Sequence, residues 1–321
     1  MSTSCCLCNE FIAATEAAAL AAGRWMGRGN AVQADAEAAE AMYQALDRME
    51  LNGTVVIGEA EEGTGSRLVR GATVGRGGRA YDLAVDPLEG AGILARGQSG
   101  AVSVLAAGAP GGIMTAPDMY MQKIAVGPQA AGVIDIDRPV TANLLAVAEA
   151  HGRKVGEITV IILDRPRHED LIAEVRQAGA RIKVIADGDI TAGIAAAVGG
   201  TGDHLSIGIG GAAEGIITAA ALRCLGGEIQ AKLWPVTRKQ VELARGHGID
   251  DIEATLTTAD LVKGDLVFSA TGVTAGEFLK GVAYFRDGAR TQTLVMCTEC
   301  HRVRFVDTIH LFSDERREIR L

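Results

Sequence analysis

The sequence predicts an α/β fold that combines a mixed N-terminal sheet with a largely parallel C-terminal sheet. In the first half of the chain, short apolar and β-branched runs are separated by glycine-rich turns, which indicates strands with hairpin-like connections. From Val140 onward, helical and strand patterns alternate, and this alternation is typical of βαβ units around a parallel sheet. The length of 321 residues and the hydrophobic content of 48% allow two domains or one large α/β unit and exclude a disordered chain.

Two helices and four strands are expected in the first half. An alanine-rich segment at 11–26 is interpreted as an amphipathic helix, because it contains charged residues and is too short to span a bilayer. A second helical pattern at 35–49 ends near the turn signal Asn52-Gly53. The strands are expected at 54–57, 80–85, 101–107 and 121–126.

The second half is predicted to alternate between helices and strands. We place a domain boundary near Gly156, which divides the chain into an α+β domain at 1–156 and an α/β domain at 157–321. The expected helices are 140–151, 169–178, 190–198 and 213–225, and the expected strands are 158–163, 182–185, 205–209, 291–296 and 303–306.

The net charge of −9, without clustered lysines or arginines, argues against nucleic acid or an anionic membrane as the main partner. Local arginines and a metal can still capture a small phosphorylated substrate. The N-terminus lacks a basic segment followed by an apolar core, so a cytoplasmic location is the default expectation. Glycine- and alanine-rich apolar faces predict a homo-oligomer, and a dimer and a tetramer fit equally well.

The six cysteines are unevenly spaced along the chain. Two of them, followed directly by a histidine, match the spacing of a c-type haem attachment motif. We reject that interpretation, because haem attachment generally requires export and the flanking strands make this segment a hairpin tip. Cys224 is expected to be a core thiol. A zinc clip would combine Cys297 and Cys300 with two ligands from among Cys5, Cys6, Cys8 and His301, which the sequence alone does not bring together.

Acidic residues occur where predicted strands end. Asp86 and Glu89 lie three residues apart across a proline, so a sharp turn can direct both carboxylates at one point. Glu59 and Glu61 follow an earlier strand, and Glu214 follows a glycine-rich strand end; a solvated acidic turn is the alternative for the first pair. Because Mg²⁺ and Mn²⁺ prefer oxygen ligands and leave positions for water and phosphate, the pattern predicts a divalent cation site in a phosphatase.

Phosphate-binding groups are predicted at neighbouring strand ends. Arg165 and Arg167 follow the strand at 158–163, and arginines on such a loop are suited to bidentate phosphate binding. Asp187 and Asp189 follow the next strand and can accept hydrogen bonds from sugar hydroxyls. A glycine-rich turn at 208–211 that leads into a helix is a weaker indication of an anion site.

Taken together, these motifs resemble the class II fructose-1,6-bisphosphatases, a metal-dependent branch of the lithium-sensitive sugar and inositol phosphatase fold. The resemblance implies a layered αβαβα sandwich, with metal binding in the N-terminal domain and sugar-phosphate binding in the C-terminal one. It also implies Mn²⁺ or Mg²⁺ as cofactor and the hydrolysis of one phosphomonoester of a sugar bisphosphate, by default fructose 1,6-bisphosphate. The matching blocks begin at Trp25, Ile57, Asp86, Ala116, Arg165, Gly208 and Ala270 and extend to about His310.

The resemblance also implies roles for individual residues. The metals would be held by Asp35, Glu59, Asp86, Glu89 and Glu214. Catalysis would involve Glu59, Asp86 and Glu89, and we add Glu61 only for its position near Glu59. The sugar phosphate would be bound by Glu89, Gly90, Tyr120, Arg165, Arg167, Asp187, Gly188, Asp189 and Gly211.

The chain departs from the family pattern at several of these blocks. Ala91 replaces a threonine that helps to activate the attacking water, and Ala31 replaces a lysine. Gly63 lies where the family continues an acidic loop, and Gly100 replaces an asparagine. Slower turnover is therefore expected, since one general-base contribution is typically worth ~10²–10⁴-fold. Two alternatives stay open: a diverged phosphatase for a heptose or octose bisphosphate in a specialised biosynthetic pathway, and a catalytically silent sugar-phosphate-binding protein.

Overall fold

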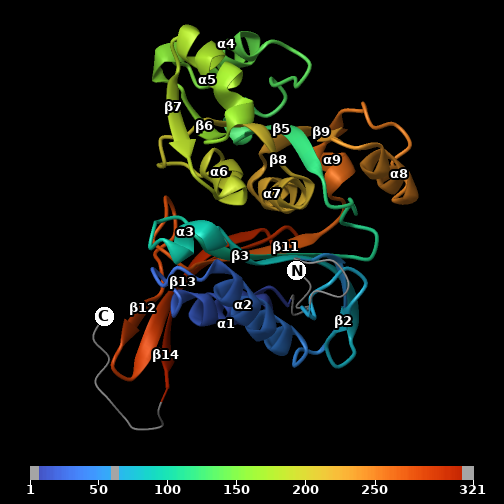
Figure 1. Ribbon diagram of the computed structural model, residues 1–321, viewed down its shortest axis with the longest axis vertical. Coiled ribbons are helices and arrows are strands. Elements are labelled where there is room, and N and C mark those ends of the chain that lie inside the picture. Colours follow the sequence, from blue (N-terminus) through green and yellow to red (C-terminus); the bar gives the residue numbers. More distant parts are fainter. Residues whose placement is uncertain (1–6, 59–64, 313–321) are drawn as a thin grey trace.

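The computed structural model describes residues 7–58 and 65–312, which form five layers (Figure 1). Helices α1 (Glu10–Gly23) and α2 (Ala31–Leu46) cover one face of the first sheet. Helices α6 (Asp189–Ala195) and α7 (Ala212–Leu225) lie between the two sheets. Helices α4 and α5, Val140–Ala150 and Glu169–Gln177, cover the far side of the second sheet. The predicted α/β class is confirmed, and the layer order agrees with an αβαβα sandwich.

The first sheet has eight strands in the order β12-β13-β11-β4-β3-β1-β2, with β14 also paired to β13. Strands β1 and β3 are parallel, whereas the other neighbours in this sheet are antiparallel. The strands are β1 (Leu51–Ile57), β2 (Thr73–Val74), β3 (Arg79–Glu89), β4 (Val102–Gly108), β11 (Leu266–Gly272), β12 (Ala283–Phe285), β13 (Gly288–Cys297) and β14 (Arg302–Leu311).

The second sheet is also mixed and has six strands in the order β10-β9-β5-β8-β6-β7. Strand β6 pairs in parallel with β7 and β8, as expected for the βαβ region, while β5, β9 and β10 pair antiparallel. The strands are β5 (Tyr120–Val126), β6 (Thr159–Leu163), β7 (Arg181–Ile185), β8 (Leu205–Gly211), β9 (Glu228–Trp234) and β10 (Leu256–Thr257).

The two sheets exchange segments of the chain. Strand β5 precedes residue 156 but belongs to the second sheet, and the strands after residue 265 return to the first sheet. The sheets therefore do not divide at residue 156, and the assignment of 1–156 and 157–321 to separate domains stays a prediction. This exchange of segments matters for the site, because it places the ends of strands from both sheets around the middle helical layer.

Helix α7 is buried on most of its surface, since it packs on strands of both sheets. Ile216 and Ile217 share one apolar core with Val104 of the first sheet and Ile229 of the second. A helix that is apolar all round is stable only when it is enclosed in this way. Enclosure of α7 fixes its N-terminal turn in the space between the sheets. Within the described residues, no helix has both the length and the apolar character needed to cross a membrane.

Short elements complete the described part of the chain. Helix α2 begins four residues earlier than predicted, because the Asn30 side chain caps it by accepting a hydrogen bond from the Gln33 amide at 3.1 Å. The remaining elements are η1 (Leu7–Asn9), α3 (Ala91–Ala95), η2 (Pro128–Ala130), η3 (Val155–Glu157), η4 (Pro166–His168), α8 (Arg238–Gly246) and α9 (Thr258–Leu261).

Candidate metal and phosphate site

A β-bulge places the carboxylates of Asp86 and Glu89 on the same face of β3. Residues three apart in a regular strand point to opposite faces. Here Asp86 lies opposite Val104 and Glu89 lies opposite Val102, so one extra residue of β3 is accommodated between them. Pro87 lies in this interval and has no amide hydrogen for the ladder, which is consistent with a break in pairing at this point. Both carboxylates consequently face the middle layer.

Glu214 lies in the first turn of α7, directly after β8 of the second sheet. Burial raises the pKa of Glu89 well above its ordinary value, and the negative charges of Asp86 and Glu214 raise it further. The Ile190 amide donates a hydrogen bond to Glu89 Oε1 at 3.1 Å, which ties the start of α6 to β3. Burial also raises the pKa of Glu214, while the nearby Lys123 ammonium opposes that shift. Asp86 and Glu214 are therefore electrostatic neighbours of the buried Glu89 carboxylate, but the ligand oxygens of these three described residues do not all lie within 4.8 Å of one another.

This donor set fits a divalent cation. Like charges buried together are unfavourable unless a cation or protons neutralise them, and oxygen-only ligands suit Mg²⁺ or Mn²⁺. The residues that would hold the cation are Asp86, Glu89 and Glu214. Asp35 lies on α2, which packs against β3, but no hydrogen bond or ion pair of the described residues joins it to these three. The predicted site residues Glu59 and Glu61, with the departure at Gly63, lie outside the described residues.

Two glycines allow acidic side chains to fold back against β8. A Cβ atom at Gly211 would lie 1.8 Å from Glu214 Oε2, and one at Gly210 would lie 1.9 Å from Asp189 Oδ2. Any larger residue would displace these carboxylates. The glycine-rich turn therefore provides close approach for the acidic side chains at the starts of α6 and α7, in addition to the weaker anion site that its sequence indicates.

The predicted arginine loop lies at the C-terminal end of β6. Arg167 donates to the Ile209 carbonyl oxygen through Nε at 3.1 Å and Nη2 at 2.8 Å, and its guanidinium lies 4.7 Å from the ring centre of Tyr120. Arg165 Nη1 donates to the carbonyl oxygens of Asp164 at 2.8 Å and Ala186 at 2.7 Å. Each guanidinium has five N–H donors, so both arginines are held by the backbone while donors remain for a phosphate.

Asp189 forms a buried ion pair that the sequence pattern does not reveal. Its partner is Lys123 on β5, which also donates to the Gly211 carbonyl oxygen at 2.9 Å. A lysine within a mostly apolar strand is the only sequence signal for this contact. Lys123 therefore places a positive charge beside Asp189 and near the Glu214 carboxylate.

Asp187 lines a cavity of about 500 Å³, and Gly188 follows it in the chain. Gly188 has a φ of 97° and precedes α6, a left-handed conformation that favours glycine, and its amide donates to Asp187 Oδ1 at 3.2 Å. Gly90, with a φ of 87°, makes the equivalent turn before α3, whose first residue is Ala91. The cavity wall includes Gly100, one of the positions that depart from the family pattern, and Phe278.

His168 is buried beneath the arginine loop and joins two strand ends. Its Nε2 accepts from the Ile209 amide at 2.8 Å, and its Nδ1 lies 2.8 Å from the Leu163 carbonyl oxygen. Because an amide can only donate and a carbonyl can only accept, the ring is neutral with its proton on Nδ1. His168 is thus a positioning residue, which single-sequence reasoning left without a role.

The neutral state of His168 leads to a pH prediction. Burial lowers its pKa below 6.5, with Arg167 contributing to the lowering, so protonation favours the unfolded chain. The stabilisation is complete above pH 6.5 and is lost as the pH falls from there toward the lowered value. We expect the free energy of unfolding of the wild type to decrease more steeply below pH 6.5 than that of His168→Gln, in urea titrations at several pH values. Parallel curves would contradict this role for His168.

Comparison with known proteins shows the family to which the chain belongs. The family model described as bacterial fructose-1,6-bisphosphatase, glpX-encoded, matches residues 6–310. The chain belongs to the bacterial fructose-1,6-bisphosphatase family. The resemblance inferred from the motifs is therefore confirmed, and membership places the chain among the phosphoric monoester hydrolases.

Relatives cover almost the whole chain. Proteins named D-fructose 1,6-bisphosphatase class 2/sedoheptulose 1,7-bisphosphatase are 43% identical in Synechococcus sp. (strain JA-2-3B'a(2-13)), 41% in Crocosphaera subtropica and 40% in Thermosynechococcus vestitus. The alignments span 94%, 94% and 97% of this chain and 94%, 95% and 98% of those relatives. The similarity thus includes both sheets and the helical layer between them.

Proposed function

We propose that this chain hydrolyses one phosphomonoester of a sugar bisphosphate, with fructose 1,6-bisphosphate as the first substrate to test. The observation that supports this most is that Asp86 and Glu214 lie near enough to the buried carboxylate of Glu89 for their negative charges to raise its pKa. Such a cluster is costly for stability, so a function that needs a cation explains it best.

The carboxylates and the arginines would bind opposite ends of the substrate. Mg²⁺ or Mn²⁺ bound by the carboxylates would polarise phosphoryl oxygens, lower the pKa of the attacking water and stabilise the leaving alkoxide. Arg165 and Arg167 would hold a second phosphate through the N–H donors that their backbone hydrogen bonds do not use. Tyr120, stacked on Arg167, restricts the orientation of that guanidinium. Asp187 accepts hydrogen bonds from the sugar at the cavity wall.

The cavity beside Asp187 favours a longer sugar bisphosphate as a second candidate substrate. The cavity has a volume of about 500 Å³, and its wall includes Asp187 and Gly100, which contributes no side chain. The names of the relatives already include fructose 1,6-bisphosphate and sedoheptulose 1,7-bisphosphate as substrates of those proteins. A heptose or octose bisphosphate is therefore the alternative.

A catalytically silent sugar-phosphate-binding protein is the other alternative, which rests on Ala91. The first residue of α3 carries no hydroxyl beside Gly90, where the family pattern has a threonine.

We also propose a homo-oligomer, dimer or tetramer, in the cytoplasm. Light scattering of the purified chain measures its assembly state, and a monomer would contradict that part of the proposal.

Phosphate release from a panel of substrates tests the function. The panel contains fructose 1,6-bisphosphate, sedoheptulose 1,7-bisphosphate, an octose bisphosphate and inositol monophosphate, each with Mg²⁺ and with Mn²⁺. We expect kcat/KM to be highest for a bisphosphate. A preference for the seven- or eight-carbon sugar would identify the cavity as the specificity site. No release from any substrate, despite sugar-phosphate binding, would contradict the proposal and favour the silent protein.

Arg167→Lys is expected to raise KM by about tenfold or more, with a smaller effect on kcat. Lysine loses the pair of hydrogen bonds to Ile209 and the planar contact with Tyr120, and a charge-assisted hydrogen bond is worth about 1.5–3 kcal/mol. Steady-state kinetics with the best substrate of the panel measure the change. Arg176→Lys, on the exposed side of α5, is the matched control. An unchanged KM would show that Arg167 does not bind substrate phosphate.

A further inference from the structure

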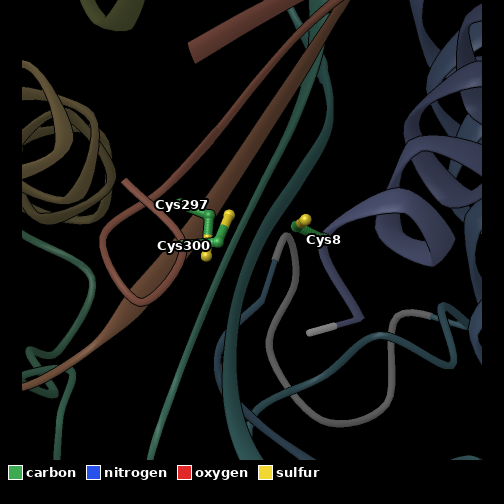
Figure 2. Close-up of side chains that lie close together, drawn as sticks. All are labelled: Cys8, Cys297 and Cys300. Atoms are coloured by element: carbon green, nitrogen blue, oxygen red, sulfur yellow. The ribbon is translucent and has the colours of Figure 1, made fainter. Parts of the chain in front are cut away.

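Three cysteines from opposite ends of the chain meet at the end of the first sheet. Cys8 lies in η1, Cys297 is the last residue of β13, and Cys300 lies in the turn before β14 (Figure 2). Their three Sγ atoms all lie within 4.8 Å of one another. The sequence offered the pair in the turn as an incomplete zinc clip, and the fold supplies a third thiol from the other end of the chain.

The spacing of the three sulfur atoms suits a tetrahedral thiolate centre. With a Zn–S bond of about 2.3 Å, the sulfur ligands of a tetrahedral site lie about 3.8 Å apart, which is inside the 4.8 Å limit that the three Sγ atoms satisfy. A disulfide would use two of the sulfurs and leave the third outside it. The two-residue spacing of Cys297 and Cys300 is also the spacing by which structural zinc sites take two ligands from one turn.

The backbone of the turn brings the second thiol of the pair back toward the first. His301, directly after Cys300, has a φ of 50° and is the single non-glycine residue with positive φ in the described part of the chain. This left-handed residue allows the four-residue connection between β13 and β14 to close tightly. The His301 side chain is exposed and does not belong to the sulfur cluster.

A positive charge accompanies the sulfurs. Arg304 Nη2 on β14 donates to Cys8 Sγ at 2.8 Å. Three thiolates around a divalent cation carry a net charge of −1, which one guanidinium neutralises. Buried charge is tolerated when it is paired in this way. Cys8 and Cys297 are both only 3% exposed, whereas Cys300 is half-buried and gives a fourth ligand access from solvent.

Cys224 provides an internal contrast. It is half-buried in α7 and does not belong to the cluster, although its thiol is near enough to Cys300 for the two to interact electrostatically. Burial raises the pKa of Cys224 to about 12. It is the matched control for the other three cysteines.

We propose that Cys8, Cys297 and Cys300 form a binding site for a thiophilic divalent cation such as Zn²⁺. Binding would join the segment before α1 to the hairpin of β13 and β14. The site is separate from the carboxylate cluster in ligand chemistry, because soft thiolates select Zn²⁺ over the Mg²⁺ or Mn²⁺ that oxygen ligands prefer. The proposal is independent of the phosphatase activity.

Co²⁺ titration of the full-length chain, reduced and stripped of metal, tests the site. Sulfur-to-cobalt charge transfer absorbs in the near ultraviolet, whereas Co²⁺ on the carboxylates gives no such band. We expect the band to saturate at one thiolate-bound Co²⁺ per chain and to disappear when Zn²⁺ is added. Cys8→Ser, Cys297→Ser and Cys300→Ser should weaken or abolish it, while Cys224→Ser should retain it.

Several outcomes would overturn the proposal. The first is the absence of a charge-transfer band in the wild type, and the second is a band of wild-type strength in Cys8→Ser. The third is a disulfide between two of the three cysteines, detected by mass spectrometry in the purified protein, together with no Co²⁺ binding once that disulfide is reduced. Circular dichroism checks that each variant is folded. If Cys8→Ser does not fold, the half-buried Cys300→Ser serves in its place, with the melting temperature as a second readout. Zn²⁺ should raise the melting temperature of the wild type and not that of Cys300→Ser.

Discussion

Glu89→Gln is expected to lower the rate of phosphate release at least about 10²-fold. The substitution removes one of three neighbouring carboxylates but keeps an oxygen that accepts the hydrogen bond from the Ile190 amide. Metal-free Glu89→Gln should be as stable as the wild type or more stable. The reason is that the pKa of Glu89 is raised in the folded state, so its ionised form opposes folding at neutral pH.

Two assays separate these effects. Phosphate release with Mn²⁺ measures activity, and urea unfolding in the presence of a chelator measures the stability of the metal-free protein. Glu149→Gln, exposed on α4, is the matched control and should change neither quantity. A wild-type rate in Glu89→Gln would remove Glu89 from the site, and a large loss of stability would assign it a purely structural role.

Lys123→Met is expected to destabilise the protein by about 3–5 kcal/mol, because it leaves a buried charge without its partner. The side chains of Lys123 and Asp189 are only 8% and 15% exposed, so solvent screens the ion pair little. The substitution also leaves the Gly211 carbonyl oxygen without the hydrogen bond from Nζ. Native proteins are typically stable by 5–15 kcal/mol, so this loss is a large share of the total.

Urea unfolding at pH 7 measures the loss, with Lys239→Met on the exposed face of α8 as control. The double variant Lys123→Met/Asp189→Asn should lose less than the sum of its two single variants, since it removes both charges of the pair. Additive losses, or a change below about 0.5 kcal/mol in Lys123→Met, would show that the ion pair does not stabilise the fold.

Local patterns in the sequence predicted most helices and strands, because apolar periodicity and turn residues act over short distances. The assignment of strands to sheets was harder. Strand β5 was grouped with the N-terminal strands, and the return of β11 to β14 into the first sheet has no local signal. Long-range pairing depends on which apolar faces fit together, and a single sequence does not encode this in any one segment.

The residues of the candidate site show the same difference between local patterns, which the sequence reveals, and long-range contacts, which it does not. Proximity of Asp86 and Glu89 was inferred from the turn after an apolar strand, whereas the structure brings them together through a bulge within β3. Lys123 was missed because one lysine in an apolar strand is not specific. The meeting of Cys8 with the cysteines of the β13–β14 turn depends on contacts between opposite ends of the chain.

The most direct test of the metal-dependent phosphatase is the Mn²⁺ dependence of phosphate release from fructose 1,6-bisphosphate in the wild type and in Glu214→Gln. Glu214 follows a strand of the second sheet, so this variant tests whether carboxylates from both sheets form one site. We predict a wild-type rate that rises from near zero and saturates with Mn²⁺, and a half-saturating concentration in Glu214→Gln that is at least about tenfold higher. A wild-type rate independent of Mn²⁺, or the same curve for both proteins, would contradict the account.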